Sequence, residues 1–306
     1  MSYSAHSHEI DARNASILID INGELIPRDA AKVSVFDSAF MLGDGIWEGL
    51  RVHHGHIAFL DRHLDRLWHA AKALDFDLGV TRAELTERLY RTLAANDMRD
   101  GVHIRLMVSR GVKSTPYQDP RVTIGPPTIV IIAEFKESTA AADERGLALF
   151  TVHVRRGYAD VQDPTLNTHS KHNCIAACIQ AAKAGADEAL MLDPHGFVAT
   201  CNSTHFFIVR GSEVWTSTGN YCLDGITRRV VIELCERHAR IVRQRNFTLA
   251  DVYSADEAFV TGTFAGLTPV TSVDGRTIGN GARPVMAELR AHYAALIDAE
   301  CGGGSS

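Results

Sequence analysis

This sequence predicts two domains of mixed helix and strand, a smaller α+β domain followed by a larger α/β domain with a mixed sheet. Its 306 residues suffice for one large or two ordinary domains with substantial cores. Short runs rich in β-branched residues alternate with stretches of helical period along the chain. A polar, alanine-rich stretch near residues 137–146 follows neither period. We therefore predict an N-terminal domain at 1–137, a linker at 138–146 and a C-terminal domain at 147–306.

Turn and cap signals predict the elements of the N-terminal domain. Asn22-Gly23 between two apolar runs indicates a type I′ hairpin, and His54-Gly55 indicates a second. Asp61 is a candidate N-cap for one helix, and Thr81 with Glu84 forms a capping box for the next. The expected strands are residues 17–21, 25–26, 46–53, 56–60, 102–109 and 128–135, and the expected helices are 61–74 and 81–96.

The C-terminal domain is predicted to combine strands and helices in the same manner. Gly185 follows a helical stretch and is suited to its C-cap, because glycine adopts the left-handed conformation there without strain. The expected strands are residues 147–154, 188–192, 197–199, 205–209, 257–261 and 269–273, and the expected helices are 173–184, 226–239 and 283–297.

Composition argues against several classes of partner. The formal net charge is −6 with both signs interspersed, so no basic stripe for nucleic acid is present. No apolar run is long enough to span a bilayer, and residues 1–11 lack the apolar centre of a signal peptide. The six cysteines form no C-x-x-C pair, and we expect no metal site. These features predict a cytoplasmic protein that binds neither membrane nor nucleic acid.

The first candidate for chemistry is Lys171, in the segment Ser170-Lys171-His172-Asn173 just before a predicted helix. A lysine at such a position is a candidate Schiff-base nucleophile if loss of solvent lowers its pKa. A solvated lysine is the commoner alternative on this signal alone.

Two loops are candidate anion sites. The segment 223–227 ends in Gly225-Ile226-Thr227, and the free N–H groups of the following helix would point at a phosphate. Thr261-Gly262-Thr263 follows an apolar strand and offers hydroxyl and N–H groups. An ordinary N-cap and an ordinary turn are the alternatives.

Arg66 is the third candidate, since it lies beside the apolar positions Leu64 and Leu67 of a predicted helix. A half-buried arginine there would be directed at an anion. A surface salt bridge with Asp61 or Asp65 is the alternative.

Together these motifs resemble one family. Their order along the chain is similar to that of fold type IV pyridoxal-phosphate enzymes, which include branched-chain aminotransferases, D-amino-acid aminotransferases, (R)-selective amine transaminases and aminodeoxychorismate lyases. The resemblance extends from about residue 17 to about residue 294. The motifs that carry it are Gly43 to Arg51, Arg62 to Leu67, Lys171, Gly225-Ile226-Thr227-Arg228, Thr261-Gly262-Thr263 and Thr268-Pro269-Val270.

The resemblance implies a pyridoxal 5′-phosphate cofactor and a role for each matching residue. Lys171 would hold the cofactor as a Schiff base and later carry a proton. Arg66 would bind the phosphate from the N-terminal domain. The remaining cofactor contacts would come from Thr200, Gly225, Ile226, Thr227 and Thr263.

On the substrate side, the resemblance places Phe40 and Trp47 as candidate pocket walls, with Arg51 in the same motif. Arg105 is similar in position to a pocket arginine of the branched-chain enzymes. The implied reaction moves an amino group from an amino acid, branched-chain or D-configured, or from an (R)-amine, to a 2-oxo acid. The family also implies a homodimer or higher oligomer.

The sequence departs from the family at the residue that pairs with the cofactor ring nitrogen. The family usually places a glutamate there, and this chain has Thr200. A hydroxyl can bond the nitrogen but does not hold it protonated as a carboxylate does. This departure keeps open the alternative of a pyridoxal-phosphate lyase or racemase on the same scaffold.

Further departures concern spacing and substrate. Lys171 to Gly185 is shorter than the family pattern by about one helical turn, and Lys183 is the nearby substitute for Lys171. The loop at 110–117 lacks the Arg-x-His carboxylate trap of the D-amino-acid enzymes, although Arg110, Lys113 or Arg105 could replace it. Gly266 stands where the branched-chain enzymes usually have an acid. The preferred enantiomer is therefore open.

Overall fold

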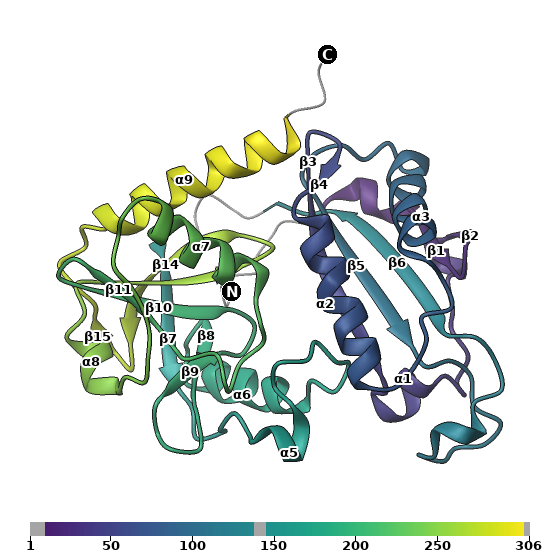
Figure 1. Ribbon diagram of the computed structural model, residues 1–306, viewed down its shortest axis with the longest axis horizontal. Helices are drawn as coiled ribbons and strands as arrows, with labels where there is room; N and C mark the ends of the chain where they lie inside the picture. Colours follow the sequence, from purple (N-terminus) through teal and green to yellow (C-terminus); the bar gives the residue numbers. More distant parts are fainter. Residues whose placement is uncertain (1–9, 138–144, 303–306) are drawn as a thin grey trace. The chain divides into compact units, whose positions relative to one another are not determined.

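The computed structural model describes residues 10–137 and 145–302. The predicted linker, residues 138–146, lies outside the described residues except for its last two positions. The chain forms two compact units (Figure 1). The N-terminal unit comprises Ile10–Glu137, Asn167–Lys171 and residues 300–302, and the C-terminal unit comprises residues 145–166 and His172–Ala299. Residues 167–171, which the sequence analysis placed in the C-terminal domain, thus pack with the N-terminal unit.

A six-stranded antiparallel sheet forms the centre of the N-terminal unit, in the order β2-β1-β6-β5-β3-β4. The predicted hairpins are confirmed: Asn22, Gly23, His54 and Gly55 all have positive φ angles. The strands are β1 (Leu18–Ile21), β2 (Glu24–Pro27), β3 (Gly45–His53), β4 (His56–Ile57), β5 (Val102–Ser109) and β6 (Thr128–Phe135).

Helices pack on this sheet through alternate residues of its strands. Helix α2 (Leu60–Ala73) contacts β3, and α3 (Arg82–Ala95) contacts β1 and β6. The capping box predicted for Thr81 and Glu84 is confirmed. The cap predicted at Asp61 is wrong, because α2 begins one residue earlier and its N-cap is Phe59. Asp61 instead lies in the first helical turn, where a negative charge favours the helix dipole.

The C-terminal unit contains a mixed sheet in the order β12-β11-β10-β13-β14-β7-β8-β9, with β15 paired to β14. Its β11–β12, β14–β7 and β7–β8 pairs are parallel, and the other pairs are antiparallel. The predicted mixed α/β class is therefore confirmed. The strands are β7 (Leu147–Thr151), β8 (Glu188–Leu192), β9 (Val198–Cys201), β10 (His205–Arg210), β11 (Glu213–Thr216), β12 (Val242–Gln244), β13 (Glu257–Gly262), β14 (Gly266–Val273) and β15 (Arg276–Thr277).

This sheet curls around an apolar core. The backbone N–H of Cys201 donates to the carbonyl of Thr204 at 3.0 Å, which brings β9 next to β10. Buried side chains from several strands, such as Leu190, Phe206 and Val260, fill the interior. The helices of this unit are α5 (Ala159–Gln162), α6 (His172–Lys183), α7 (Ile226–Arg237), α8 (Leu249–Tyr253) and most of α9 (Pro284–Cys301).

The elements that the sequence analysis missed are short. A run of two to five residues contains too few positions to show a helix or strand period. They are α1 (Ser38–Leu42), α5, α8, β11, β12, β15 and the 3-10 helices Ala12–Ser16, Arg28–Ala30 and Pro120–Val122. Over the two described stretches, no helix has the length and apolar character needed to cross a membrane.

Candidate active site

Lys171 lies at the end of a segment that pairs with β3 in the N-terminal unit. The backbone N–H of Trp47 donates to the carbonyl of Asn167 at 3.0 Å, and the Asn167 amide returns a hydrogen bond to the carbonyl of Trp47 at 2.6 Å. The His169 N–H donates to the carbonyl of Gly45 at 2.8 Å. Residues 167–169 are therefore fixed to the strand, and half-buried Lys171 extends from a defined backbone position.

Trp47 organises the charges around Lys171. The Lys171 Nζ is 5.4 Å from the centre of the Trp47 ring, and the Arg105 guanidinium carbon is 3.7 Å from it. The indole N–H donates to the carbonyl of Thr168 at 3.1 Å, which holds the ring in place. Burial lowers the pKa of Arg105, but an arginine stays protonated at neutral pH. The structure thus brings Lys171, Trp47 and Arg105 together with two cations near one aromatic ring.

The other two predicted substrate residues differ in their surroundings. Arg51 lies on the same sheet face as Arg105 and donates to the backbone carbonyl of Lys136. Phe40 lies on α1 and is 70% exposed in the single chain. Their roles in substrate binding stay predictions.

Arg66, the predicted phosphate ligand, is bound to Glu48 on the helix-covered face of the sheet. Its Nε and one terminal nitrogen reach the two carboxylate oxygens at 2.8 Å and 2.6 Å. His63 completes the group with its Nδ1 at 2.7 Å from Glu48 Oε2. The structure thus gives this side chain a partner other than Asp61 or Asp65, the alternative considered from the sequence. The phosphate role stays a prediction, and Glu48 was not identified from the sequence.

Charge compensation keeps the Glu48 group ionised. Burial alone would raise the pKa of Glu48, but Arg66 and His63 outweigh burial and hold it below its ordinary value. Burial lowers the pKa of His63, so its ring is neutral near pH 7. The Arg66 charge is therefore already balanced by Glu48, and the pair orients the guanidinium.

The start of α7 in the C-terminal unit has the properties of an anion site. Gly225 is the N-cap and provides no side-chain hydrogen bond to the helix. Ile226 and Thr227 follow and are 2% and 4% exposed. The first N–H groups of this 12-residue helix, at the positive end of the helix dipole, therefore receive no capping oxygen from the N-cap side chain. A phosphate group fits this chemistry.

His205 forms one wall of this site and was not identified from the sequence. A Cβ atom at Gly225 would lie 2.2 Å from the Nε2 of His205. The backbone of Gly225, with φ −71° and ψ 130°, suits any residue, so glycine is required here for space. Because separate parts of the chain supply the ring and the glycine, no local motif in the sequence reveals this contact.

Two threonines from the predicted second anion loop differ in burial. His205 pairs with Thr261 across β10 and β13, so their side chains share a face. The Thr261 hydroxyl is fully buried, and no hydrogen-bond partner for it occurs among residues 10–137 and 145–302. Thr263 is half-buried in the turn between β13 and β14. An unsatisfied buried hydroxyl beside an uncapped helix start is consistent with a ligand oxygen at this place.

Thr200 lies in β9, opposite Met191 of β8, and is buried. Its hydroxyl donates to the backbone carbonyl of Thr204 at 2.8 Å. A hydroxyl has one hydrogen, so in this arrangement the Thr200 oxygen offers a ligand only its acceptor lone pairs.

Glu188 is a buried acid near Thr200 but does not substitute for a carboxylate at that position. Its Oε1 accepts hydrogen bonds from the Ser203 N–H and hydroxyl at 3.1 Å and 2.7 Å and from the Thr204 hydroxyl at 2.9 Å. Burial raises the pKa of Glu188 above its ordinary value, although the hydrogen bonds from Ser203 and Thr204 act to lower it. By strand alternation Glu188 faces away from Met191, whereas Thr200 pairs with Met191 on the same face.

The alternative candidates from the sequence are engaged elsewhere. Arg110 binds Asp44 with its Nε at 2.7 Å from the carboxylate. Lys113 is buried and donates to the backbone carbonyl of Asp119 at 3.0 Å. Lys183 is exposed near the end of α6. Arg105 is therefore the candidate carboxylate partner that lies beside Lys171.

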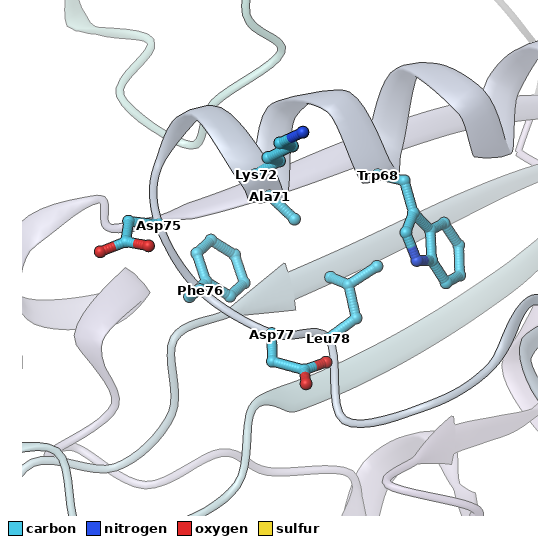
Figure 2. A pocket seen from close by; sticks show the side chains of 7 residues that line it. All are labelled: Trp68, Ala71, Lys72, Asp75, Phe76, Asp77 and Leu78. Carbon is cyan, nitrogen blue, oxygen red and sulfur yellow. The ribbon is translucent and has the colours of Figure 1, made fainter.

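A surface hollow of about 360 Å³ lies at the C-terminal end of α2 (Figure 2). Figure 2 shows Trp68, Ala71 and Lys72 on the helix and the other lining residues on the segment after it. None of the predicted site residues lines the hollow, which includes Asp75, Phe76, Asp77 and Leu78. Across the described parts of the chain, no cluster of three or more His, Cys, Asp or Glu side chains is arranged to hold a metal.

Comparison with known proteins identifies related sequences over most of the chain. Residues 45–273 match the family described as amino-transferase class IV. The branched-chain-amino-acid aminotransferase-like protein 2 of Arabidopsis thaliana is 41% identical over 286 residues, which are 93% of this chain and 51% of that protein. The chain thus spans about half the length of this relative.

Other relatives are matched over nearly their whole length. A putative branched-chain-amino-acid aminotransferase of Methanocaldococcus jannaschii is 41% identical over 86% of this chain and 90% of its own. A D-alanine aminotransferase of Listeria monocytogenes is 30% identical over 92% and 96%. The structure of the T.th. branched-chain amino acid aminotransferase with pyridoxamine 5′-phosphate superposes with a TM-score of 0.86, at 31% identity over 94% of this chain and 95% of that chain.

The contact between Gly225 and His205 leads to a double-mutant prediction. Gly225→Ala is expected to lower the free energy of unfolding by about 1–3 kcal/mol, because the new methyl group overlaps the imidazole ring. His205→Ala removes the ring, so the double variant Gly225→Ala/His205→Ala should be more stable than the sum of the single effects predicts. Thermal or urea unfolding of the four proteins measures this coupling.

Gly125→Ala is the matched control, since a Cβ atom there meets nothing within 4 Å. It is expected to leave the stability near that of the wild type. Strictly additive effects of Gly225→Ala and His205→Ala would contradict the packing described here.

Proposed function

The chain belongs to the class IV aminotransferase family, and from this premise we propose that it is a pyridoxal 5′-phosphate-dependent aminotransferase. It would move an amino group from an amino acid or amine donor to a 2-oxo acid acceptor. The observation that carries the proposal is the start of α7, where Gly225 provides no side-chain cap to the first helical N–H groups. In the N-terminal unit, the candidate Schiff-base lysine, Lys171, lies beside Trp47 and Arg105. The named relatives support the same reaction class.

The proposed cofactor and the residues that would hold it have distinct tasks. When bound, pyridoxal 5′-phosphate supplies an electron sink for the bond changes at the substrate carbon. Lys171 holds the cofactor through its Nζ. When its amine is free, the same Nζ accepts and returns the proton of the substrate carbon. The N–H groups of Ile226 and Thr227 and the hydroxyls of Thr227 and Thr263 bind the phosphate.

Arg105 is the proposed partner of the substrate carboxylate. Its planar guanidinium is held over the Trp47 ring and presents a fork of donors suited to a carboxylate. Relatives named for branched-chain amino acids and for D-alanine are both found, which supports an α-amino acid donor and leaves both series as candidate donors. None of these relatives is named a lyase or racemase, and the comparisons do not favour that alternative.

We propose that two copies of the chain associate through an apolar face of the N-terminal unit. The face consists of the segment 33–42 and the loop that ends at Ile124. Two backbone hydrogen bonds of 2.9 Å connect these parts: the Lys113 N–H donates to the Phe36 carbonyl, and the Ile124 N–H donates to the Val112 carbonyl. Such a patch is suited to burial against a second copy. Its side chains, each between 42% and 70% exposed, are Val33, Val35, Phe36, Phe40, Leu42, Tyr117 and Ile124.

We also propose a cytoplasmic location. All six cysteines are free thiols, as expected in a reducing compartment.

The spectrum of the cofactor-loaded protein tests the proposed reaction. We expect a visible absorption band that bleaches when one class of amino donor is added without acceptor and returns when a 2-oxo acid is added. L-amino acids, D-amino acids and (R)-amines are compared in turn. Lys171→Ala is expected to lose the band, because it has no amine to bond the cofactor.

Lys183→Ala is the control for this assay and should keep both the band and its bleaching. A wild-type band that no donor bleaches would contradict the transaminase proposal. Loss of the band in Lys183→Ala rather than in Lys171→Ala would contradict the assignment of the lysine.

Thr200 gives a prediction about rate. If its side chain lies beside the cofactor ring nitrogen, Thr200→Glu supplies a carboxylate that keeps the nitrogen protonated, and turnover should rise by about tenfold, or about 1.4 kcal/mol of barrier. Thr200→Gln has the same size without the charge and is expected to give no rise. Steady-state kinetics measure the turnover of both variants. Equal turnover of Thr200→Glu and Thr200→Gln would show that residue 200 does not lie beside the ring nitrogen.

The apolar face gives a prediction about assembly. Light scattering of the wild type is expected to give at least twice the mass of one chain. Ile124→Asp places a charge in the apolar face and should shift the protein toward the monomer. Val161→Asp changes a residue that is 80% exposed in the C-terminal unit and should not. A monomeric wild type would contradict the proposed dimer.

A further inference from the structure

Arg156 lies between β7 and α5 and contacts four separate segments of the C-terminal unit. Its backbone N–H donates to the carbonyl of Leu192, at the end of β8, with a length of 2.9 Å. Its half-buried side chain makes four further contacts. The Nε donates to the Tyr221 carbonyl at 3.2 Å, one terminal nitrogen reaches Asn173 Oδ1 at 3.2 Å and Cys174 Sγ at 3.3 Å, and the other donates to the Pro164 carbonyl at 3.4 Å.

These partners are neutral acceptors. In the part of the chain that the structure describes, no carboxylate forms an ion pair with Arg156. The side chain therefore acts here through the directions of its N–H groups, a rigid planar fork that lysine does not reproduce.

The first turn of α6 is held by this fork. The side-chain amide of Asn173 accepts from Arg156 through its oxygen and donates to the backbone carbonyl of Arg155 through its nitrogen at 2.9 Å. Lys171 is two residues before Asn173 in the chain, so their Cα atoms are at most about 7 Å apart. A constraint on Asn173 is thus a constraint on the backbone from which the Lys171 side chain extends.

The same guanidinium also holds the loop before α7, because its Nε donates to the Tyr221 carbonyl. Tyr221 lies four residues before Gly225, the N-cap of α7. Its ring packs edge-on against Tyr158 and His195 with centroid distances of 6.0 Å, and its hydroxyl lies 3.2 Å from His195 Nε2. The side chain of Tyr221 is therefore fixed by aromatic packing, and its carbonyl is fixed by Arg156.

We propose that Arg156 is a positioning residue that sets the spacing between the first turn of α6, which directly follows Lys171 in the chain, and the phosphate-binding start of α7. The inference rests on the proposed function, in which one rigid cofactor is bonded to Lys171 and bound through its phosphate at α7. A cofactor of fixed length requires both attachment points to be held to within about 0.5 Å. One guanidinium that contacts both segments meets this requirement directly.

The experiment compares Arg156→Ala and Arg156→Lys with Arg155→Ala, which changes an exposed neighbouring arginine. The dissociation constant for pyridoxal 5′-phosphate is measured by titration of the apoprotein. The fraction of Lys171 bonded to the cofactor at saturation is measured by borohydride reduction and mass spectrometry. Amide hydrogen exchange of the apoprotein reports on residues 172–175 and 221–226 without any cofactor.

For both Arg156 variants we expect a dissociation constant about tenfold higher, which is about 1.4 kcal/mol, and a smaller bonded fraction of Lys171 even at saturation. Exchange should accelerate in both segments. Millimolar guanidinium should partly restore cofactor binding to Arg156→Ala, because it supplies the missing fork. Arg155→Ala should match the wild type in every measurement.

The outcomes separate this proposal from the proposed function. A wild type that binds no pyridoxal 5′-phosphate refutes the proposed function, and the positioning role falls with it. A wild type that binds, together with Arg156 variants of unchanged affinity and unchanged bonding at Lys171, refutes the positioning role alone. If Arg156→Ala does not fold, Arg156→Lys decides by the same criteria.

Discussion

Because Gly225 has no side chain, the N-cap position of α7 supplies no capping oxygen to the first N–H groups at the positive end of the helix dipole. The C-terminal unit is arranged around this constraint. The ring of His205 occupies the volume that a Cβ atom would need, and the buried hydroxyl of Thr261 lies on the same sheet face as His205. An anion is the ligand that satisfies such a set of donors.

Strand alternation separates two sets of charges in the N-terminal unit. Glu48 faces the helices and holds Arg66 in a buried ion pair, whereas the adjacent residue, Trp47, faces the other way and packs against Arg105. One strand, β3, thereby orients a balanced charge pair on one face and two cations, Arg105 and Lys171, near one indole ring on the other. The cationic face is the one suited to a carboxylate substrate.

Features of the fold that depend only on neighbouring residues could be predicted from short sequence motifs. The capping box of Thr81 and the positive φ of Asn22 depend on residues within three positions, and both were predicted. The functions of Lys171 and Gly225 were inferred from motifs of a few residues. Contacts between distant segments have no such signal: Arg156 and Tyr221 are separated by 65 positions, and the His205 ring meets Gly225 only after β10 and α7 have packed.

Glu188, the buried carboxyl bound to the neighbouring Thr204, does not supply the acid that is missing at position 200. Strand alternation directs it to the opposite face, where Ser203 and Thr204 occupy its Oε1. Thr200 offers only acceptor lone pairs, because its hydrogen is bonded to the Thr204 carbonyl. In the proposed site, a neutral partner would stabilise charge on the cofactor ring less than a carboxylate does, so more of the rate would have to come from geometry. Under this proposal, Trp47 and Arg156 would affect catalysis more strongly than they would in an enzyme with a carboxylate beside the ring nitrogen.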